Sequence, residues 1–316
     1  MIVLFTADIH IKLGQKNVPV EWSKNRYRLF RNQLIKTIHS SMAELLILGG
    51  DIFDKLPNME ELEIYFDLIS CLPINTIIYS GNHEALKKNT TFLSSLKLPT
   101  ELINPKVKVI DDFHTEYGID FIPYNKLKEY HPSDIDFHSN VLCTHVRGEI
   151  PPHVKPEVNL NIFDRWDIVL AGDLHSYENC QRNILYPGSP MTTSFHRNKV
   201  DTGMIVLDLE TLSHTWVKLD LPQLIRKTIS PGDPMPSGEI DHVVYEVEGN
   251  LSELSKVSNS ELLDKKIVTR NTESELILTS DMTIIQEIEE YLKYILGLPS
   301  DTIELAIMEL HNYVNK

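Results

Sequence analysis

The feature that most constrains this chain is a set of five short apolar runs, each of which ends abruptly in glycine or in polar residues. The runs span residues 2–5, 45–48, 74–79, 141–143 and 168–171. Short runs rich in Ile, Val and Leu and bounded by glycine are typical of strands buried on both faces of a sheet. The pattern therefore predicts a sheet-based fold in which several strand ends present polar side chains.

Helical periodicity fills the gaps between the first three runs. Residues 24–39 and 59–72 have apolar side chains at three- and four-residue spacing, which predicts two amphipathic helices. Alternation of strand and helix favours right-handed crossovers and parallel strands. Later strand-like segments at 204–209 and 215–219 have shorter connections and are expected to be antiparallel. The predicted class is α/β (α+β).

The length of 316 residues suggests two domains, or one large domain with an appendage. A proline-rich stretch after about residue 221 predicts a linker, marked by Pro222, Pro231, Pro234 and Pro236. Strand-like segments at 242–247, 267–270 and 276–279 follow, and two amphipathic helices separated by Gly297-Leu298-Pro299 end the chain. We predict a catalytic core at 1–220, an accessory or capping domain at 221–280 and a helical partner-binding tail at 281–316.

Charge and cysteine content restrict the possible binding partners and the cellular compartment. The formal net charge of −15 argues against nucleic acid as a partner, but −9 of it falls in the last 96 residues. Residues 12–36 instead hold seven basic side chains and one acidic one. Three scattered cysteines indicate a reducing compartment, and no segment resembles a signal peptide or a membrane span.

The polar residues at the strand ends are types that bind metal ions. They form the motifs Asp8-x-His10, Gly50-Asp51, Gly81-Asn82-His83, a lone His145, and Gly172-Asp173-x-His175. Oxygen and imidazole donors without thiolate suit Mn²⁺, Fe²⁺, Zn²⁺ or Mg²⁺. Any one motif alone is more often an ordinary turn, but their common position after strands favours one shared metal site.

In this order the motifs resemble the calcineurin-like metallophosphoesterase superfamily, whose pattern is Asp-x-His, Gly-Asp, Gly-Asn-His-(Asp/Glu), His and Gly-His-x-His. The resemblance covers residues 1–220 and is strongest to the SbcD-type recombination nuclease subunits, in their smaller phage versions. Gly49-Gly50-Asp51-Ile52-Phe53-Asp54 and Tyr186-Pro187-Gly188-Ser189-Pro190 are similar to segments of that subgroup. One departure is Asp173, where the family has histidine.

The resemblance implies a β-sandwich flanked by helices, with a smaller C-terminal accessory domain and a helical tail. It also implies two divalent ions, with Mn²⁺ favoured and Mg²⁺ as the alternative. Asp8, His10, Asp51 and His175 would hold one ion, and Asp51 would bridge to a second held by Asn82, His145 and Asp173. His83 would be the catalytic residue. Apart from the resemblance, two interpretations stay open for Asp54 and Glu84: they orient the ligating histidines, or they are ordinary acidic loop residues. His196 follows the Ser189-Pro190 segment closely enough that it could approach the site, although an ordinary position away from the site is the first expectation for it.

For function, the resemblance implies a two-metal DNA nuclease subunit with 3′→5′ exonuclease and single-strand endonuclease activity in recombination, repair or phage replication. Its expected partners are DNA and an SbcC-type coiled-coil ATPase, in a homodimer within a heterotetramer, in the host cytoplasm and not at a membrane. The basic residues beside the motifs predict DNA contacts at Lys16, Lys24, Arg26, Arg28, Lys87 and Lys88, with an ordinary solvated helix face as the alternative. Two alternatives stay open: a small-molecule phosphodiesterase or phosphatase, and a non-catalytic scaffold that recruits the ATPase.

Overall fold

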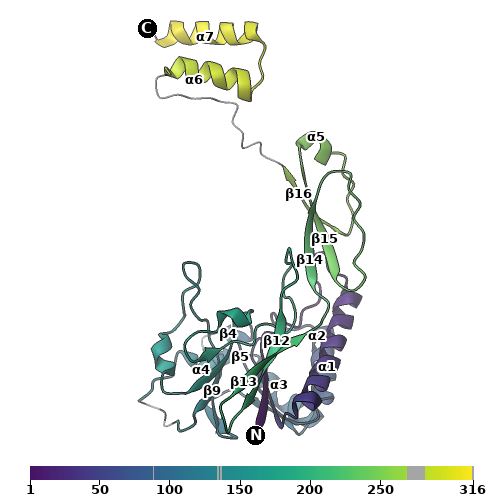
Figure 1. Cartoon of the computed structure of the whole chain (residues 1–316), viewed down its shortest axis with the longest axis vertical. Helices are drawn as coiled ribbons and strands as arrows, with labels where there is room; N and C mark the ends of the chain where they lie inside the picture. Colours follow the sequence, from purple (N-terminus) through teal and green to yellow (C-terminus); the bar gives the residue numbers. More distant parts are fainter. Residues whose placement is uncertain (88, 134, 136, 269–281, 315–316) are drawn as a thin grey trace.

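Two sheets form the base of the structure, a computed structural model that describes residues 1–87, 89–133, 135, 137–268 and 282–314 (Figure 1). The larger sheet has the strand order β13-β12-β1-β2-β3-β6. Its strands are β1 (Ile2–Thr6), β2 (Leu45–Gly49), β3 (Asn75–Tyr79), β6 (Val107–Ile110), β12 (Thr202–Asp208) and β13 (His214–Leu219). Strands β1, β2, β3 and β6 are parallel, whereas β12 and β13 are antiparallel, as their short connections predicted.

The second sheet has five strands in the order β11-β10-β9-β8-β7. They are β7 (His114–Glu116), β8 (Ile119–Ile122), β9 (Val141–His145), β10 (Ile168–Gly172) and β11 (Ile184–Leu185). All pairs are parallel except β7 with β8. A separate hairpin is formed by β4 (Ala85–Lys87) and β5 (Thr90–Thr91).

Helices cover both sheets. The six-stranded sheet packs against α1 (Val20–Ser41), α2 (Met59–Ser70) and α3 (Leu93–Ile103), and the short helices α4 (Tyr124–Leu127) and η1 (Leu160–Phe163) lie over the other sheet. The short helix η2 (Tyr177–Asn179) contributes Tyr177 to the core between the sheets. Helix α2 begins at a capping box, in which the Asn58 side chain accepts from the Glu61 N–H and the Glu61 side chain accepts from the Asn58 N–H.

Strand β1 explains why these runs are apolar throughout. Val3 and Phe5 point into the core between the two sheets, where they meet Phe121 and Leu170, while Leu4 points to the core under the helices. A strand buried on both faces has no solvent side on which polar residues could alternate. The structure thus confirms the predicted class, a β-sandwich flanked by helices.

A third, three-stranded parallel sheet follows, in the order β14-β15-β16. It comprises β14 (Leu224–Ile229), β15 (His242–Gly249) and β16 (Leu263–Val268), with α5 (Leu251–Leu254) between the last two. The linker prediction was wrong over β14, because the prolines lie just before and just after this strand and leave its ladder intact. The predicted strand at 276–279 and residues 269–270 lie outside the described residues.

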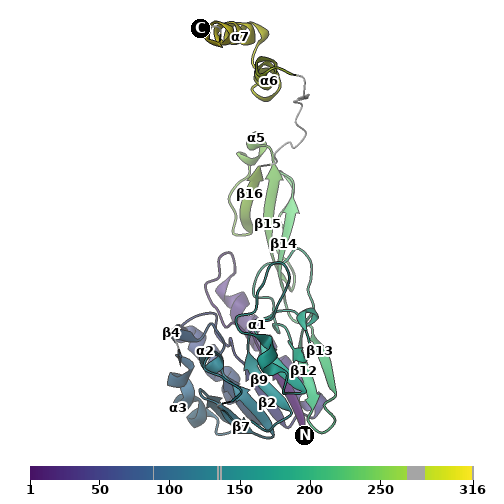
Figure 2. The same cartoon turned by 90° about the vertical axis from the view of Figure 1, so that its left-hand side faces the viewer.

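The start of α1 lies against this third sheet (Figure 2). The Trp22 indole N–H donates to the Ile240 carbonyl over 3.2 Å, and the His242 ring lies 2.5 Å from the Asn17 carbonyl. The two sequence regions are more than 200 residues apart, so only folding brings them together.

Two helices end the described chain, as predicted. They are α6 (Ile284–Glu290), which continues as a π-helical turn (Tyr291–Ile295), and α7 (Ser300–Val314), and they lie side by side (Figures 1 and 2). Gly297, with φ of +59°, makes the turn between them. Among the described residues, no helix is both long and apolar enough to cross a membrane. The division at residues 220 and 280 stays a prediction.

Candidate metal centre

The first group of candidate ligands is formed by Asp8, His10 and His175. The Nε2 atoms of His10 and His175 face each other at 3.2 Å. Asp8 Oδ1 lies 4.0 Å from the first of these nitrogens and 3.9 Å from the second. The loops after β1 and β10 therefore bring three donor atoms to one point, although 165 residues separate the two histidines.

Asp51 joins this group to a second one. Its Oδ2 lies 3.6 Å from His10 Nε2 and 3.5 Å from His145 Nε2. Asn82 Oδ1 is 2.9 Å from the same His145 nitrogen. One carboxylate oxygen thus sits between donors contributed by the two different sheets.

These spacings suit divalent ions. Two ligand atoms that each lie about 2.1 Å from one ion are about 3–3.5 Å apart, close to the separations observed. All the donors are carboxylate, amide or imidazole atoms, the set that first-row divalent ions and Mg²⁺ accept. The residues present fit a pair of divalent ions.

Hydrogen bonds fix which imidazole nitrogen faces the centre. His145 Nδ1 lies 2.9 Å from the Gly49 carbonyl, so Nδ1 is the donor and Nε2 keeps its lone pair when the ring is neutral. His83 Nδ1 likewise lies 2.6 Å from the Asp54 carbonyl. His175 Nδ1 is 3.1 Å from the Thr193 hydroxyl. Each ring therefore aims Nε2 inward.

The backbone is strained at four candidate ligands. Asp8, His10, Asp51 and Asp173 have φ angles of +59°, +49°, +51° and +101°. Non-glycine residues rarely adopt positive φ, and such strain collects at functional sites where surrounding contacts enforce it. Here the Asp8 and His10 N–H groups donate to the carbonyls of Gly50 and Asp51, which ties the β1 loop to the β2 loop.

Gly81 allows the β3 loop to approach this pair. A Cβ atom at Gly81 would lie 2.1 Å from Asp51 Oδ1, a separation that no side chain could relieve without moving the carboxylate. The glycine in the Gly-Asn-His motif is therefore required by the position of Asp51.

Glu84 and Asp54 support the centre in different ways. The buried Glu84 carboxylate accepts three backbone N–H bonds, from Asp51, Phe53 and Gly81. Among the described residues, no hydrogen bond joins Glu84 to a histidine, so the structure does not support a direct role of Glu84 in orienting one. Asp54 does position His83 through its carbonyl, and its carboxylate lies 3.8 Å from His10 Nδ1.

Crowded carboxylates dominate the electrostatics. Burial raises the pKa of Asp8 well above its usual value. Burial alone would lower the pKa of His145, but the neighbouring Asp51, Asp8 and Asp173 carboxylates raise it well above normal. Burial lowers the pKa of His10 to about 3 and raises that of Glu84 to about 7. A centre with this excess of buried acid calls for added positive charge, which divalent ions supply.

Asp173 is the exception among the predicted ligands. Its N–H donates to both Asp8 oxygens, at 3.1 and 3.2 Å, but its carboxylate pairs with the Arg147 guanidinium. Among the described residues, three groups have ligand atoms within 4.8 Å of one another, and Asp173 is in none of them. The structure brings its backbone to the centre and holds its carboxylate on Arg147.

His83 lies beside the centre with its ring half-exposed. Its Nε2 is 3.9 Å from Asp51 Oδ2, and its ring stands edge-on to His10 with centroids 4.7 Å apart. It is grouped with His10 and Asp51 as a set that could hold an ion, so its position alone is compatible with ligation as well as with catalysis.

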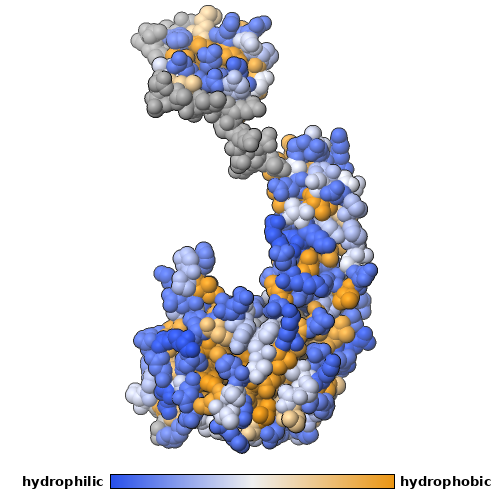
Figure 3. Space-filling view, viewed as in Figure 1, coloured by the Kyte–Doolittle hydropathy of each residue, from blue (hydrophilic) through white to orange (hydrophobic). Residues whose placement is uncertain are grey.

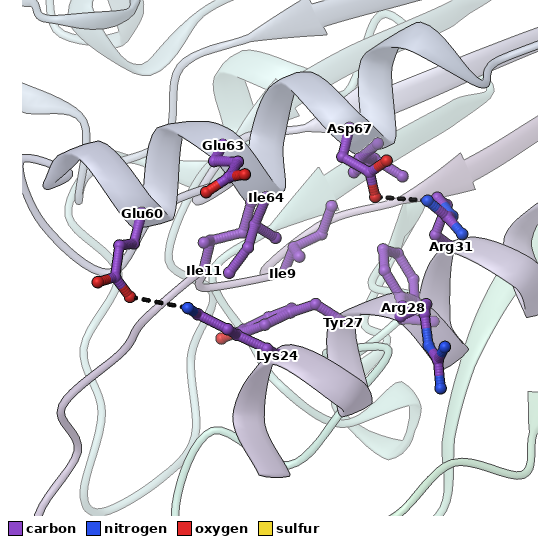
Figure 4. Close-up of a pocket in the computed structure, with 12 residues that line it drawn as sticks. Ile9, Ile11, Lys24, Tyr27, Arg28, Arg31, Glu60, Glu63, Ile64 and Asp67 are labelled. Carbon is purple, nitrogen blue, oxygen red and sulfur yellow. Dashed lines mark hydrogen bonds and ion pairs between the residues drawn. The ribbon is translucent and has the colours of Figure 1, made fainter. Parts of the chain in front are cut away.

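The predicted DNA contacts on α1 are mostly engaged elsewhere. Lys24 pairs with Glu60 of α2 at 3.0 Å across the groove of about 320 Å³ between the helices (Figure 4). Arg31, a basic residue of α1 that was not among the predicted contacts, pairs with Asp67 across the same groove at 2.5 Å. Arg26 is buried and donates to the Thr192 carbonyl, so the prediction that it contacts DNA was wrong. The acidic residues that neutralise α1 belong to α2, which a count within one segment misses.

The remaining predicted contacts are less engaged. Lys16 is largely exposed and 3.7 Å from Asp264, Arg28 donates to the neighbouring Asn25, and Lys87 is exposed on β4. Lys88 lies outside the described residues. For Lys16, Arg28 and Lys87, contact with DNA therefore stays a prediction.

Sequence reasoning missed the surroundings of His175. A cavity of about 700 Å³ lies beside it, lined among others by Thr193, His196 and Lys199. His196 does approach the site in this sense, since it shares that cavity. The nearby Arg197 and Arg147 are exposed or half-exposed, and no motif or periodicity marks either residue.

Comparison with known proteins agrees with this geometry. Residues 1–201 match the family described as calcineurin-like phosphoesterase, and the chain belongs to that family. The protein named "Probable exonuclease subunit 1" of Escherichia phage T5 is 40% identical over an alignment of 324 residues, which covers 99% of each chain. The chain is thus a metal-dependent phosphoesterase of the kind that phages encode.

Two solved structures are similar at lower identity. An archaeal phosphodiesterase has a TM-score of 0.39 and 14% identity, and covers 69% of this chain and all of its own. The protein TT1561 of Thermus thermophilus has a TM-score of 0.42 and 13% identity, over 69% of this chain and 98% of its own. Similarity at this level is too low to inform the function.

Proposed function

We propose that this member of the calcineurin-like phosphoesterase family is the nuclease subunit of an SbcCD-type complex. It hydrolyses DNA phosphodiester bonds at a two-ion centre, as a 3′→5′ exonuclease and a single-strand endonuclease. The observation on which the proposal rests is the position of Asp51 Oδ2, at 3.6 Å from His10 Nε2 and 3.5 Å from His145 Nε2, so that Asp51 would help to hold both ions. The phage T5 relative, similar over its full length, supports DNA as the substrate.

In this function, one set of residues would bind the metal ions and His83 would act on the substrate. Asp8, His10, Asp51 and His175 would hold the first ion, and Asp51, Asn82, His145 and Asp173 the second. Bound divalent ions polarise phosphoryl oxygens and provide a nucleophile at neutral pH. His83 aims Nε2 toward the centre from outside the buried donors, where it can stabilise negative charge or give a proton to the leaving 3′-oxygen. Mn²⁺ is the favoured ion, with Mg²⁺ as the alternative.

The cavity beside His175 is the proposed path of the DNA strand. Among its lining residues, Thr193, His196 and Lys199 carry hydroxyl, imidazole and ammonium groups that can donate hydrogen bonds to a phosphate backbone. The exposed Arg197 lies next along the chain.

The proposed partners use other surfaces. The helical pair α6–α7 exposes Ile284, Leu305 and Met308. Figure 3 shows hydrophobic and hydrophilic residues side by side on the described part of this pair. An amphipathic pair of this kind suits the coiled-coil root of an SbcC-type ATPase. Helix α3 exposes Leu98 and Leu102, which we assign to the homodimer contact. A phage-encoded complex of this type would act in the host cytoplasm.

The test combines two substrates with one enzyme. The full-length protein is incubated with Mn²⁺ or Mg²⁺, with and without its ATPase, on end-labelled duplex DNA and on a chromogenic phosphodiester. We expect cleavage of both, and shortening of the DNA from its 3′ ends. An Asp51→Asn variant should lose both activities, whereas His39→Ala, a surface histidine on α1, should keep them.

Other outcomes separate the alternatives. Hydrolysis of the small ester with DNA intact under every condition would indicate a small-molecule phosphodiesterase. Inactivity on both substrates, with the ATPase still bound, would indicate a scaffold.

A further inference from the structure

Arg147 forms the only described ion pair of the Asp173 carboxylate, at the edge of the candidate centre. Arg147 Nε lies 3.1 Å from Asp173 Oδ2, and Arg147 Nη2 lies 3.3 Å from Asp173 Oδ1. Both carboxylate oxygens are therefore engaged by one planar guanidinium, the two-point geometry in which arginine binds carboxylates best.

Both residues are placed by their position in the sheets. Arg147 is two residues beyond His145 at the end of β9, and Asp173 directly follows β10. These strands are parallel neighbours, with His145 paired to Gly172, so the two side chains leave the sheet at adjacent points. The pairing is thus a result of strand register.

The two side chains of the pair differ in how far they are exposed to solvent. The Asp173 side chain is 6% exposed, and its N–H is held by the Asp8 carboxylate. The Arg147 side chain is 46% exposed, so it can turn into solvent. The Arg147 N–H donates to Glu157 Oε1 at 3.3 Å, which anchors its backbone but not its guanidinium. The aspartate stays in place, and the arginine can leave it.

We propose that Arg147 competes with the second divalent ion for Asp173, so that this ion binds more weakly than the first. The inference rests on the proposed two-ion centre. Both oxygens of Asp173 already accept from Arg147, so an ion at this carboxylate meets a negative charge that is already paired, and it must share the carboxylate with the guanidinium or displace it. Arg147 also brings a permanent positive charge to the edge of that site, which repels a cation. The first ion, held by Asp8, His10, Asp51 and His175, has no such competitor among the described residues.

Direct titration of Mn²⁺ tests this without relying on activity. Free Mn²⁺ is measured by electron paramagnetic resonance during titration of the full-length wild type, Arg147→Ala, Arg147→Gln and Arg182→Ala. We expect two affinities in the wild type, and a weaker site that tightens about fivefold in both Arg147 variants, the factor that an ion pair of this exposure is worth. Arg147→Gln keeps most of the side-chain stem, which guards against a folding defect in Arg147→Ala.

Arg182 provides the matched control. Its side chain is 39% exposed, close to the 46% of Arg147, and it pairs with Asp164 at 2.5 Å away from the candidate ligands, so its loss should leave both affinities unchanged. Asp173→Asn in turn should weaken the second site and leave the first intact.

The titration distinguishes failure of the Arg147 competition from failure of the proposed function. Two Mn²⁺ sites whose affinities do not tighten in either Arg147 variant would overturn the competition and leave the proposed function standing. A wild type that binds no Mn²⁺ would overturn the proposed function itself.

Discussion

At the scale of single residues, the centre consists of donors that the backbone forces together. Asp8, His10 and Asp51 all have positive φ, which costs each of them about 1 kcal/mol or more. Loop-to-loop hydrogen bonds and close-packed glycine hold these conformations. The strain preorganises the donors, so little rearrangement is needed when an ion binds.

His83→Ala tests whether His83 is catalytic or a ligand. In the proposed two-ion centre, both ions have ligands other than His83, so the variant should bind Mn²⁺ with unchanged stoichiometry. Turnover should fall by about 10²–10⁴, as expected for loss of a general acid or a charge-stabilising group. Metal titration beside steady-state kinetics checks this, with His39→Ala as the control. Loss of one bound ion would instead make His83 a ligand.

Proton release should accompany metal binding. Asp8 and His145 have raised pKa values, from burial and from neighbouring carboxylates respectively, so the ion-free centre retains protons that an ion displaces. Lower pH therefore favours the protonated, ion-free form, and affinity should fall about tenfold per pH unit for each displaced proton. Calorimetry of Mn²⁺ binding in two buffers of different ionisation enthalpy measures this. A binding enthalpy independent of the buffer would contradict it.

At the scale of elements, strand ends supply the donors and Glu84 joins the loops that hold them. Its carboxylate links the β2 loop, through Asp51 and Phe53, to Gly81 of the β3 loop. These are backbone bonds to a fully buried acid, so removal of an oxygen leaves buried N–H groups without partners.

Glu84→Gln should consequently destabilise the fold. The amide keeps one acceptor oxygen and places a donor against a backbone N–H, so the free energy of unfolding should fall by about 2–4 kcal/mol. Urea unfolding of the metal-free protein measures it. Glu116→Gln, at a half-exposed ion pair with Lys108, should change stability by about 0.5 kcal/mol or less. Equal effects of the two substitutions would show that Glu84 has no special role.

At the scale of the whole molecule, the sandwich, the third sheet and the helical pair present separate surfaces. The centre lies where the two sheets of the sandwich meet, and the cavity beside His175 includes His196, whose backbone pairs with Ile225 of β14. The third sheet is thereby tied to the segment that borders the centre. The exposed apolar residues on α3 and on α6–α7 are the surfaces that we propose for protein partners.

The helical tail should decide ATPase binding. Leu305 and Met308 are 60% and 55% exposed on α7, so acidic substitutions there should disrupt docking without disturbing a core. Leu305→Asp with Met308→Asp should abolish co-purification of the ATPase while Mn²⁺ binding persists. Deletion of residues 281–316 should do the same, and Glu304→Ala on the same helix should not. Undiminished co-purification would exclude this surface.

Helix α3 should decide the oligomeric state. Leu98 and Leu102 are 66% and 73% exposed, one turn apart on the same helix. Leu98→Glu with Leu102→Glu should convert a dimer to a monomer, and Ser94→Glu, exposed on the first turn of α3, should not. Light scattering after size exclusion gives the mass directly. A double variant that stays dimeric would place the contact elsewhere.

The sequence by itself determined the sheet-based class, the first two helices and the residues from which a metal centre can be built. These features are local: periodicity reports burial within a segment, and a motif after a strand reports that strand's end. The strands β1, β2, β3, β9 and β10 were predicted for this reason. Strand β14 was missed because its neighbouring prolines outweighed a short apolar signal.

Tertiary structure alone decided what those residues do to one another. Arg26 counts as a basic side chain in its segment, yet its guanidinium binds a carbonyl 166 residues away. Asp173 is a plausible ligand by type, yet strand register places Arg147 on it. Charge and donor type are properties of a residue, but whether that charge is free or that donor faces an ion depends on the partner that folding brings within about 3 Å.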